Sequence, residues 1–307
     1  LYVIGAEHTV LHLLYSRFWV KALHDLGLVA DDESYKIRRN RGLILGPDGN
    51  KMSKSKGNVI NPDEIVDRLG ADTVRLYLCF MGPYGITVNY PWDPNGVVGV
   101  RRFLERVWKM GQTVIQSQQE EHSNILENVR ISKSLHKTIK GITEDIEEFK
   151  FNTSISKMMI LMNEWESHFA EASRDKESET VSVDDFKLFL QLLAPFAPHI
   201  AEELWQQLLA PQGRSLGTIL KDRPFSAESI HITSWPKYDP ALLVDDELTI
   251  AVQVNGKIRA DFTVPADTSE DDIKTMAQHH EKVLPWIDGK DIKKVIYVKG
   301  KLVSIVI

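Results

Sequence analysis

Helical periodicity runs through the middle of the chain, from Val97 to about Leu209, and constrains the fold more than any other feature. Apolar residues recur there every three or four positions, the pattern of helices that bury one face. The predicted helices are Val98–Ser117, Ile131–Phe149, Thr153–Ala170 and Val183–Leu209. Because proline interrupts helices, Pro195 and Pro198 should break the last one. The centre of the chain is therefore expected to be an α-helical bundle.

After Asp245 the pattern changes to short alternating segments typical of strands. The predicted elements are strands Thr249–Val254 and Ile258–Val264, a helix within Ser269–Val283, and strands Val295–Val298 and Leu302–Ile307. Asn255-Gly256 between the first two strands is a strong hairpin signal. Lys299-Gly300 marks a second hairpin. The tail is predicted to be a small β-β-α-β-β module.

Before the bundle, short strands and helices alternate. We expect a strand near Tyr2–Gly5, a helix over His8–Asp25 and a strand at Leu43–Leu45. Asn61 and Asp72 are expected to cap the two helices that follow. Polar or Pro/Gly-rich composition predicts connections at Gln118–Asn128, Ser173–Ser182 and Pro211–Ser229.

Composition narrows the classes of function. Cys79 is the only cysteine, so no disulfide can form within the chain, a Cys-rich zinc site is excluded, and a reducing, cytoplasmic location is favoured. The net charge is −6, which argues against a wholly basic nucleic-acid binder and restricts RNA contacts to local basic patches. No apolar run is long enough to span a membrane.

The segment from Lys51 to Asn58 carries the strongest chemical signal. A lysine-rich stretch is often only a solvated loop. Here, however, lysine ammonium groups and two serine hydroxyls lie between Gly49 and Gly57, which would let the loop close over a polyphosphate. Cations placed at a transferring phosphoryl group stabilise its transition state.

Lys51-Met52-Ser53-Lys54-Ser55 is identical to the KMSKS motif, and the chain resembles the class I aminoacyl-tRNA synthetases. The resemblance implies that all five residues bind ATP, which arrives with Mg²⁺. Lys51 and Lys54 would be the catalytic cations, and Lys54 would act at the pyrophosphate end.

The N-terminal segment resembles leucyl-tRNA synthetases within this class, through Tyr2–His8 and Leu11–Phe18. The resemblance implies that Gly5 and Glu7 bind the ATP ribose and that His8 forms part of the leucine pocket. Ile4 stands where the family carries a glycine. Leu43–Leu45 resembles the strand that contacts adenine, which assigns Ile44 and Leu45 to the ATP site.

His8 and His12 are four residues apart, a spacing that also suits zinc, but no third ligand is evident. We therefore expect no bound zinc and a packed His12. Leu193–Trp205 resembles the helical anticodon-binding domain of the leucyl, isoleucyl and valyl enzymes. Within it, Phe196 and Trp205 are expected to be core residues.

The tail resembles the C-terminal module of bacterial-type leucyl-tRNA synthetases, which meets the tRNA elbow. The candidate tRNA-binding residues are Lys257, Arg259, Lys293, Lys294, Lys299 and Lys301. Lysine and arginine contact phosphates well. The alternative is an ordinary solvated face, because Asp261, Asp271, Asp272 and Asp291 offset much of this charge.

The expected organisation is multidomain α/β plus α: residues 1–96 form the C-terminal half of a Rossmann-like catalytic fold, 97–240 a helical anticodon-binding domain, and 245–307 the tail module. The resemblance implies leucine, ATP and tRNA(Leu) as substrates. The HIGH motif is absent from the sequence, so a HIGH-containing N-terminal half, on the same or another chain, is an expected partner. The alternatives are a stand-alone tRNA-binding protein and an isoleucyl- or valyl-tRNA synthetase fragment.

Overall fold

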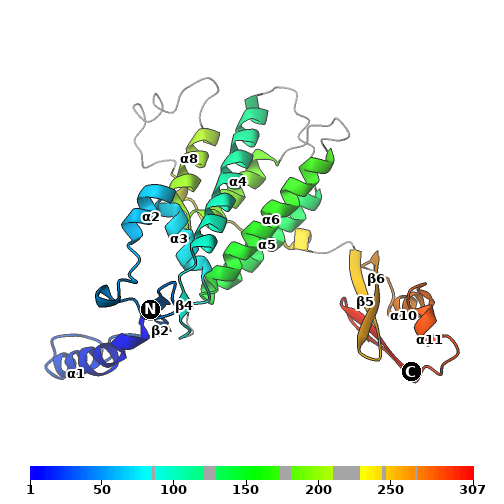
Figure 1. Cartoon of the computed structure of the whole chain (residues 1–307), viewed down its shortest axis with the longest axis horizontal. Helices are drawn as coiled ribbons and strands as arrows, with labels where there is room; N and C mark the ends of the chain where they lie inside the picture. The colour runs from blue at the N-terminus through cyan, green and yellow to red at the C-terminus, as the bar shows by residue number, and fades with distance from the viewer. Residues whose placement is uncertain (85–86, 120–128, 173–180, 210–228, 244–246, 267) are drawn as a thin grey trace. The chain divides into compact units, whose positions relative to one another are not determined.

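The computed structural model describes residues 1–84, 87–119, 129–172, 181–209, 229–243, 247–266 and 268–307 (Figure 1). These residues form two compact units, Leu1–Tyr238 and Asp239–Ile307. The connections predicted at Gln118–Asn128, Ser173–Ser182 and Pro211–Ser229 lie mostly outside the described residues. Over the part of the chain that is described, no helix has the length and apolarity needed to cross a membrane.

The first unit begins with two pairs of parallel strands. Strand β1 (Tyr2–Gly5) pairs with β2 (Arg38–Arg41), and β3 (Ile44–Leu45) pairs with β4 (Tyr90–Pro91). Between β1 and β2 lie a short 3₁₀ turn, a π-helical turn and a helix, and the helical residues run without a break from Thr9 to Asp25. The bounds of the three elements are η1 Ala6–His8, η2 Leu11–Tyr15 and α1 Ser16–Asp25. The helix predicted from His8 to Asp25 is therefore confirmed, with a π-helical turn in its first half.

Strand β2 consists of three arginines and an asparagine, a composition that gives no strand signal. Its backbone is ordered by pairing with β1, and its side chains are held by aromatic rings of the helical part. The Arg41 guanidinium lies 4.1 Å from the centre of the Tyr84 ring and donates hydrogen bonds to the Tyr84 hydroxyl (2.6 Å) and to the Leu78 carbonyl (3.1 Å). Arg39 lies 4.7 Å over the Phe149 ring. Cation–π contacts of this kind anchor β2 to the helices.

Two short helices, α2 (Pro62–Leu69) and α3 (Ala71–Phe80), follow the Lys51–Asn58 loop. The Asn61 side chain accepts a hydrogen bond from the Asp63 N–H at 3.1 Å, so the predicted cap is confirmed. The prediction that Asp72 caps α3 is wrong. Gly70, with φ +87°, occupies that cap, which places Asp72 inside the helix.

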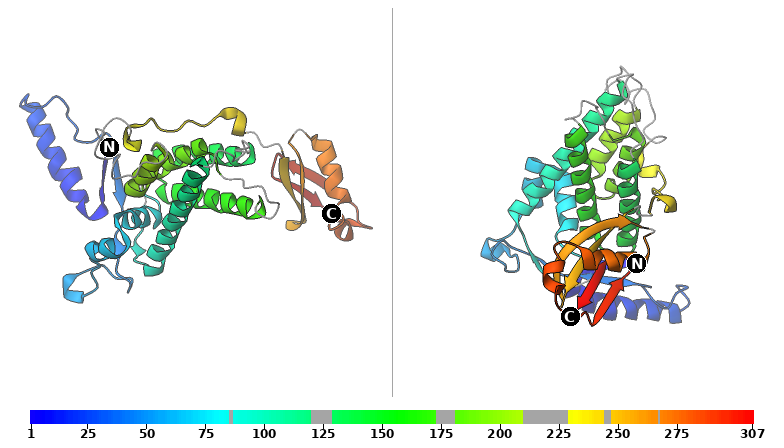
Figure 2. Two further views of the ribbon diagram at one scale, coloured as in Figure 1. Left: turned by 90° about the horizontal axis from the view of Figure 1, so that it is seen from above. Right: turned by 90° about the vertical axis from the view of Figure 1, so that its right-hand side faces the viewer.

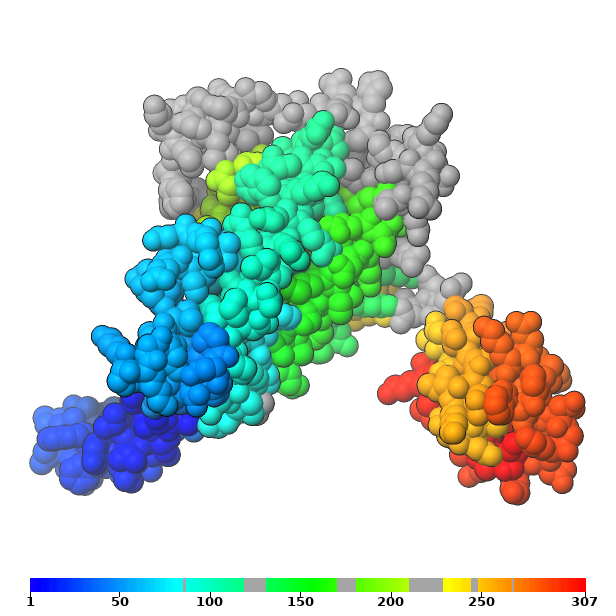
Figure 3. Space-filling view, viewed as in Figure 1, coloured from blue at the N-terminus to red at the C-terminus, as the bar shows by residue number. Residues whose placement is uncertain are grey.

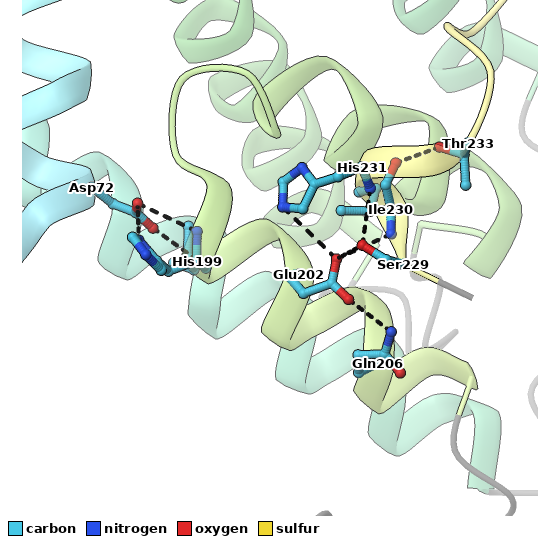
Figure 4. Close-up of polar contacts among 9 residues, drawn as sticks. Asp72, His199, Glu202, Gln206, Ser229, Ile230, His231 and Thr233 are labelled. Atoms are coloured by element: carbon cyan, nitrogen blue, oxygen red, sulfur yellow. Dashed lines mark hydrogen bonds and ion pairs between the residues drawn. The ribbon is translucent and has the colours of Figure 1, made fainter. Parts of the chain in front are cut away.

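The Asp72 carboxylate instead caps helix α8, 127 residues further along the chain. It accepts hydrogen bonds from the Ile200 N–H (2.8 Å) and the His199 N–H (3.3 Å), and lies 2.8 Å from His199 Nδ1 (Figure 4). Because amides at a helix N-terminus lack partners within the helix, this carboxylate fixes α8 against α3.

Five helices form the bundle that the periodicity predicts (Figures 1 and 2). Their bounds are α4 Pro94–Gln119, α5 Val129–Glu147, α6 Phe151–Ala172, α7 Val183–Leu193 and α8 Pro198–Leu209. The break between α7 and α8 confirms the effect of Pro195 and Pro198. Phe196 and Trp205 are buried, as predicted.

The bundle core is continuous with the helices before it. Trp165 and Phe189 are fully buried and share one apolar cluster with Leu76 and Tyr77 of α3. The expected boundary at residue 96 therefore falls within a single packed unit. After α8, two short 3₁₀ turns follow, η4 (Ile230–Ile232) in the first unit and η5 (Pro240–Leu243) in the second.

The second unit is a four-stranded sheet in the order β6-β5-β8-β7, with two helices between its hairpins. The bounds are β5 Glu247–Val254, β6 Lys257–Pro265, α10 Glu270–His279, α11 Leu284–Ile287, β7 Lys294–Val298 and β8 Leu302–Val306. Asn255 and Gly256 both have positive φ (+46° and +78°), as a type I′ hairpin turn requires. Ile250 and Val303 of the sheet pack with Ile273 of α10 in a separate core. Both predicted hairpins are confirmed, and α10 confirms the helix predicted within Ser269–Val283. The short helix α11 follows that range and was not predicted.

Candidate nucleotide-binding site

The candidate ATP loop leaves the end of β3 through a tight turn. The Gly49 N–H donates to the Gly46 carbonyl (2.9 Å), and the Gly46 N–H donates to the Asn50 carbonyl (2.8 Å). Gly49 has φ +73°, which favours glycine. A Cβ on Gly46 would lie 2.6 Å from the Asp48 carboxylate, so a larger residue would displace that side chain.

Asn58 closes the loop that this turn opens. Its side-chain oxygen accepts from the Ser53 N–H at 2.8 Å, and its amide nitrogen donates to the Asp48 carboxylate (3.2 Å) and to the Lys51 carbonyl (3.3 Å). Hydrogen bonds from the Asn50 backbone N–H and from the Asn58 and Asn50 side chains lower the pKa of Asp48. The sequence analysis gives Asn58 no role. Its position immediately after Gly57, at the end of the loop, is the sequence feature that could have indicated that it closes the loop.

Lys51 and Glu7 bring the loop and the end of β1 together. The Lys51 ammonium donates to the Glu7 carboxylate at 2.7 Å, and both side chains are exposed. The hydrogen bond from Lys51, followed by its positive charge, lowers the pKa of Glu7. Two residues assigned separately to the ATP site, 44 positions apart, therefore meet at one place.

Lys54 lies at the exposed tip of the loop, in the 3₁₀ turn η3 (Lys54–Lys56). The turn ends at Gly57, whose φ is +66° and whose N–H donates to the Lys54 carbonyl. The Ser53 and Ser55 hydroxyls lie 2.8 Å apart beside it. Ammonium and hydroxyl groups gathered on an exposed tip are the donors that a polyphosphate requires.

The remaining predicted site residues lie on the strands beside the loop. Ile44 and Leu45 are half-buried in β3, and Leu45 forms a β-bridge with Lys51. Met52 packs against the main core. Gly5 ends β1 with φ −63°, and a Cβ there would meet only Glu7 and His8 side-chain atoms at 3.9 Å. Within this unit, neither the backbone conformation nor the space around Gly5 therefore requires a glycine.

His8 is exposed next to Glu7, whereas His12 is packed. The His12 ring lies 4.8 Å from the Tyr2 ring, and its Nδ1 is 3.3 Å from the Tyr35 hydroxyl. The prediction of a packed His12 is confirmed, and the two histidines have different surroundings.

The basic residues predicted to bind tRNA all lie in the second unit. Lys257, Lys293, Lys294, Lys299 and Lys301 are exposed. Arg259 of β6 lies 3.4 Å over the ring of Trp286 in α11, and Trp286 is 42% exposed. Trp286 was not singled out from the sequence, although a tryptophan beside basic residues is a recognisable signal for a nucleic-acid surface.

Comparison with known proteins identifies the family of the chain. A family profile described as "tRNA synthetases class I (I, L, M and V)" matches residues 14–90, and one described as "Anticodon-binding domain of tRNA ligase" matches residues 129–275. The second match begins in the helical bundle and runs past the boundary between the two units. The chain therefore belongs to the class I tRNA synthetases and carries a catalytic fragment followed by an anticodon-binding domain.

Within that class, the chain corresponds to the C-terminal part of leucyl-tRNA synthetases. It is 45% identical over its whole length to the leucine–tRNA ligase of Leptospira biflexa and 43% identical over 99% of its length to that of Alkaliphilus oremlandii. It spans about a third (32% and 33%) of those proteins. A solved ternary complex of the Agrobacterium radiobacter K84 agnB2 LeuRS with tRNA and LeuAMS aligns with 99% of the chain at 32% identity and a TM-score of 0.76, and the chain covers 38% of that enzyme. These matches favour the leucyl enzymes over the isoleucyl and valyl alternatives.

Proposed function

We propose that the chain is part of an enzyme that activates leucine with ATP and transfers the leucyl group to tRNA(Leu). The observation that carries this proposal is the closed Lys51–Asn58 loop, which exposes Lys51 and Lys54 and pairs Lys51 with Glu7, just after β1. The parallel pairs β1–β2 and β3–β4 fit the C-terminal half of a Rossmann-like catalytic fold.

In adenylate formation the leucine carboxylate attacks the α-phosphate of ATP and pyrophosphate leaves. Negative charge builds on the phosphate oxygens, and the Lys51 and Lys54 ammonium groups are the residues that would stabilise it. Mg²⁺ would arrive with ATP. Movement of Lys51 toward the phosphates would free the Glu7 carboxylate to accept hydrogen bonds from the ribose hydroxyls. His8, beside Glu7, would contribute to the leucine pocket.

An uncovered apolar surface supports the expected partner, the HIGH-containing part of the enzyme. The segment from Val10 to Trp19 exposes large apolar side chains, and this segment (dark blue) is uncovered on the face in Figure 3. They are Val10, Leu11, Leu13, Leu14, Tyr15, Phe18 and Trp19, between 38% and 68% exposed. Exposed apolar patches of this kind mark interaction sites. We propose that the catalytic part of the enzyme that contains the HIGH motif covers this surface.

For tRNA, we propose two contributions: the helical bundle acts as the anticodon-binding domain, and the basic residues of the second unit bind phosphates. Arg259 and Trp286 add a stacked pair on the same unit. Salt dependence is the measurable property of such contacts, because each neutralised phosphate releases counterions.

The test is leucine-dependent ATP–pyrophosphate exchange. The chain alone is expected to show none, since the HIGH motif is absent. Addition of a purified HIGH-containing part from a leucyl enzyme should restore exchange, and Lys54→Ala in the same mixture should abolish most of it. If the pure chain catalysed exchange, the proposal that the active site is shared between this chain and the HIGH-containing part would be contradicted. If the mixture is stable and binds tRNA(Leu) but catalyses no ATP–pyrophosphate exchange, the alternative of a stand-alone tRNA-binding protein would be supported.

A further inference from the structure

A pocket of about 510 Å³ lies in the helical part of the first unit, and none of its lining residues belongs to the Lys51–Asn58 loop. Its volume is in the range of sites that enclose small molecules, and its lining is almost entirely apolar. Three aromatic residues contribute to the wall: Phe151, Phe196 and Trp235.

Each of the three aromatic side chains is held in position by the surrounding fold. Phe196 is buried at the break between α7 and α8, and Phe151, at the start of α6, lies 6.1 Å from it, ring centre to ring centre. Trp235 donates its indole N–H to the Thr143 hydroxyl at 2.9 Å. The pocket is therefore lined by fixed rings, as a preformed site requires.

The segment that carries Trp235 is itself fastened to α8. The Glu202 carboxylate accepts hydrogen bonds from the Ser229 hydroxyl (2.9 Å) and the Ile230 N–H (3.0 Å), and His231 Nε2 lies 3.8 Å from it (Figure 4). These contacts fix the chain a few residues before Trp235, so the wall that Trp235 forms is anchored at both Thr143 and Glu202.

Among the described residues that line the pocket, Glu147 is the only charged one, and its side chain is exposed. Its neighbours Glu144, Asp145 and Glu148 each pair with a lysine. Within the described residues, Glu147 has no ion-pair partner. An unpaired carboxylate beside aromatic rings attracts a cation and repels an anion.

We propose that this pocket binds a small amphipathic amine, with its apolar body among Phe151, Phe196 and Trp235 and its ammonium group at Glu147. The rings provide faces for a flat or aliphatic body, and the carboxylate orients the charged end. The pocket volume limits the body to a drug-sized molecule or smaller.

The experiment uses the whole 307-residue chain and three probes of one shape: 4-phenylbutylamine, 4-phenylbutanol and 4-phenylbutyrate. Affinities are measured by calorimetry or ligand-observed NMR. The amine should bind about five-fold more tightly than the alcohol, the scale of a partly exposed cation–π and ion-pair contact, and the carboxylate should bind most weakly. Equal affinities for the amine and the carboxylate, or no binding by any probe, would overturn the proposal.

Cys79 locates the bound probe, because it lines the pocket and is the only cysteine in the chain. Burial raises the pKa of its thiol, so alkylation with iodoacetamide is followed at alkaline pH. Saturating 4-phenylbutylamine should slow alkylation several-fold. An unchanged rate would place the amine elsewhere and refute the site.

A matched pair of variants isolates the carboxylate. Glu147→Gln should equalise the affinities of the amine and the alcohol and leave the alcohol's affinity unchanged. Glu148→Gln, at the adjacent residue, should keep the full preference for the amine, because Glu148 pairs with Lys150 and does not line the pocket. Both variants change exposed side chains, so folding should be preserved. Identical behaviour of the two variants would contradict the assignment of Glu147.

Discussion

Removal of the Asp72 carboxylate is expected to destabilise the first unit by about 2–4 kcal/mol, more than an ordinary helix cap. The Asp72 side chain is only 11% exposed and accepts hydrogen bonds from two amides of α8. Loss of an Asp cap costs about 0.5–2 kcal/mol, and hydrogen bonds to a charged group contribute about 1.5–3 kcal/mol. The His199 imidazole is 75% exposed, so its pairing adds no more than about 1 kcal/mol.

The perturbation is Asp72→Ala, and the assay combines urea unfolding with amide hydrogen exchange. Exchange should accelerate at the His199 and Ile200 amides, because these lose their acceptor. If Asp72 instead capped its own helix, the first amides of α3 would lose protection. His199→Ala is the control and should cost less than about 1 kcal/mol. A loss of less than about 1 kcal/mol for Asp72→Ala, or faster exchange confined to α3, would refute the reasoning.

Three further outcomes are expected. In the reassembled enzyme, Lys54→Ala should raise the barrier to adenylate formation by about 2–4 kcal/mol with little change in leucine binding. If the variant forms adenylate at the wild-type rate in rapid-quench measurements, Lys54 is not a catalytic residue. The pKa of Glu7 should lie below its ordinary value by NMR titration and return to it in Lys51→Ala. The Lys51–Glu7 pair is thus present at neutral pH and lost as the pH falls through that lowered pKa; an unchanged pKa in the variant would disprove the contact. Truncation after Asp245 should weaken tRNA binding and flatten its salt dependence while leucine activation stays near wild type; an unchanged salt slope would show that the tail's lysines do not contact phosphates.

Much of the candidate site was predictable because its residues are adjacent in sequence. The Lys51–Ser55 motif and the flanking glycines define, by residue type and spacing alone, a loop with ammonium and hydroxyl donors. The contact between Lys51 and Glu7 was not predictable from either segment alone, since 44 residues separate them. The role of Asn58 also depends on the folded loop, in which one amide side chain reaches Ser53, Asp48 and Lys51.

The sequence by itself determined the elements whose signals are local. Apolar spacing set the helices of the bundle, proline ended α7, and Asn255-Gly256 set the first hairpin of the second unit. Each of these depends on interactions within a few residues, so a short window contains the necessary information.

Only the tertiary structure decided the features that depend on distant partners. The strand β2 forms because it pairs with β1 and because aromatic rings contact Arg39 and Arg41. Its own composition gives no signal for a strand. Asp72 caps α8 rather than α3 because packing brings two helices together that lie more than a hundred residues apart. The pocket beside Glu147 exists because residues from four separate segments meet around a space that none of them fills. Local propensity contains no information on contacts between residues that are distant in sequence. These contacts are stabilised by the packing and desolvation of side chains that come together only when the chain folds.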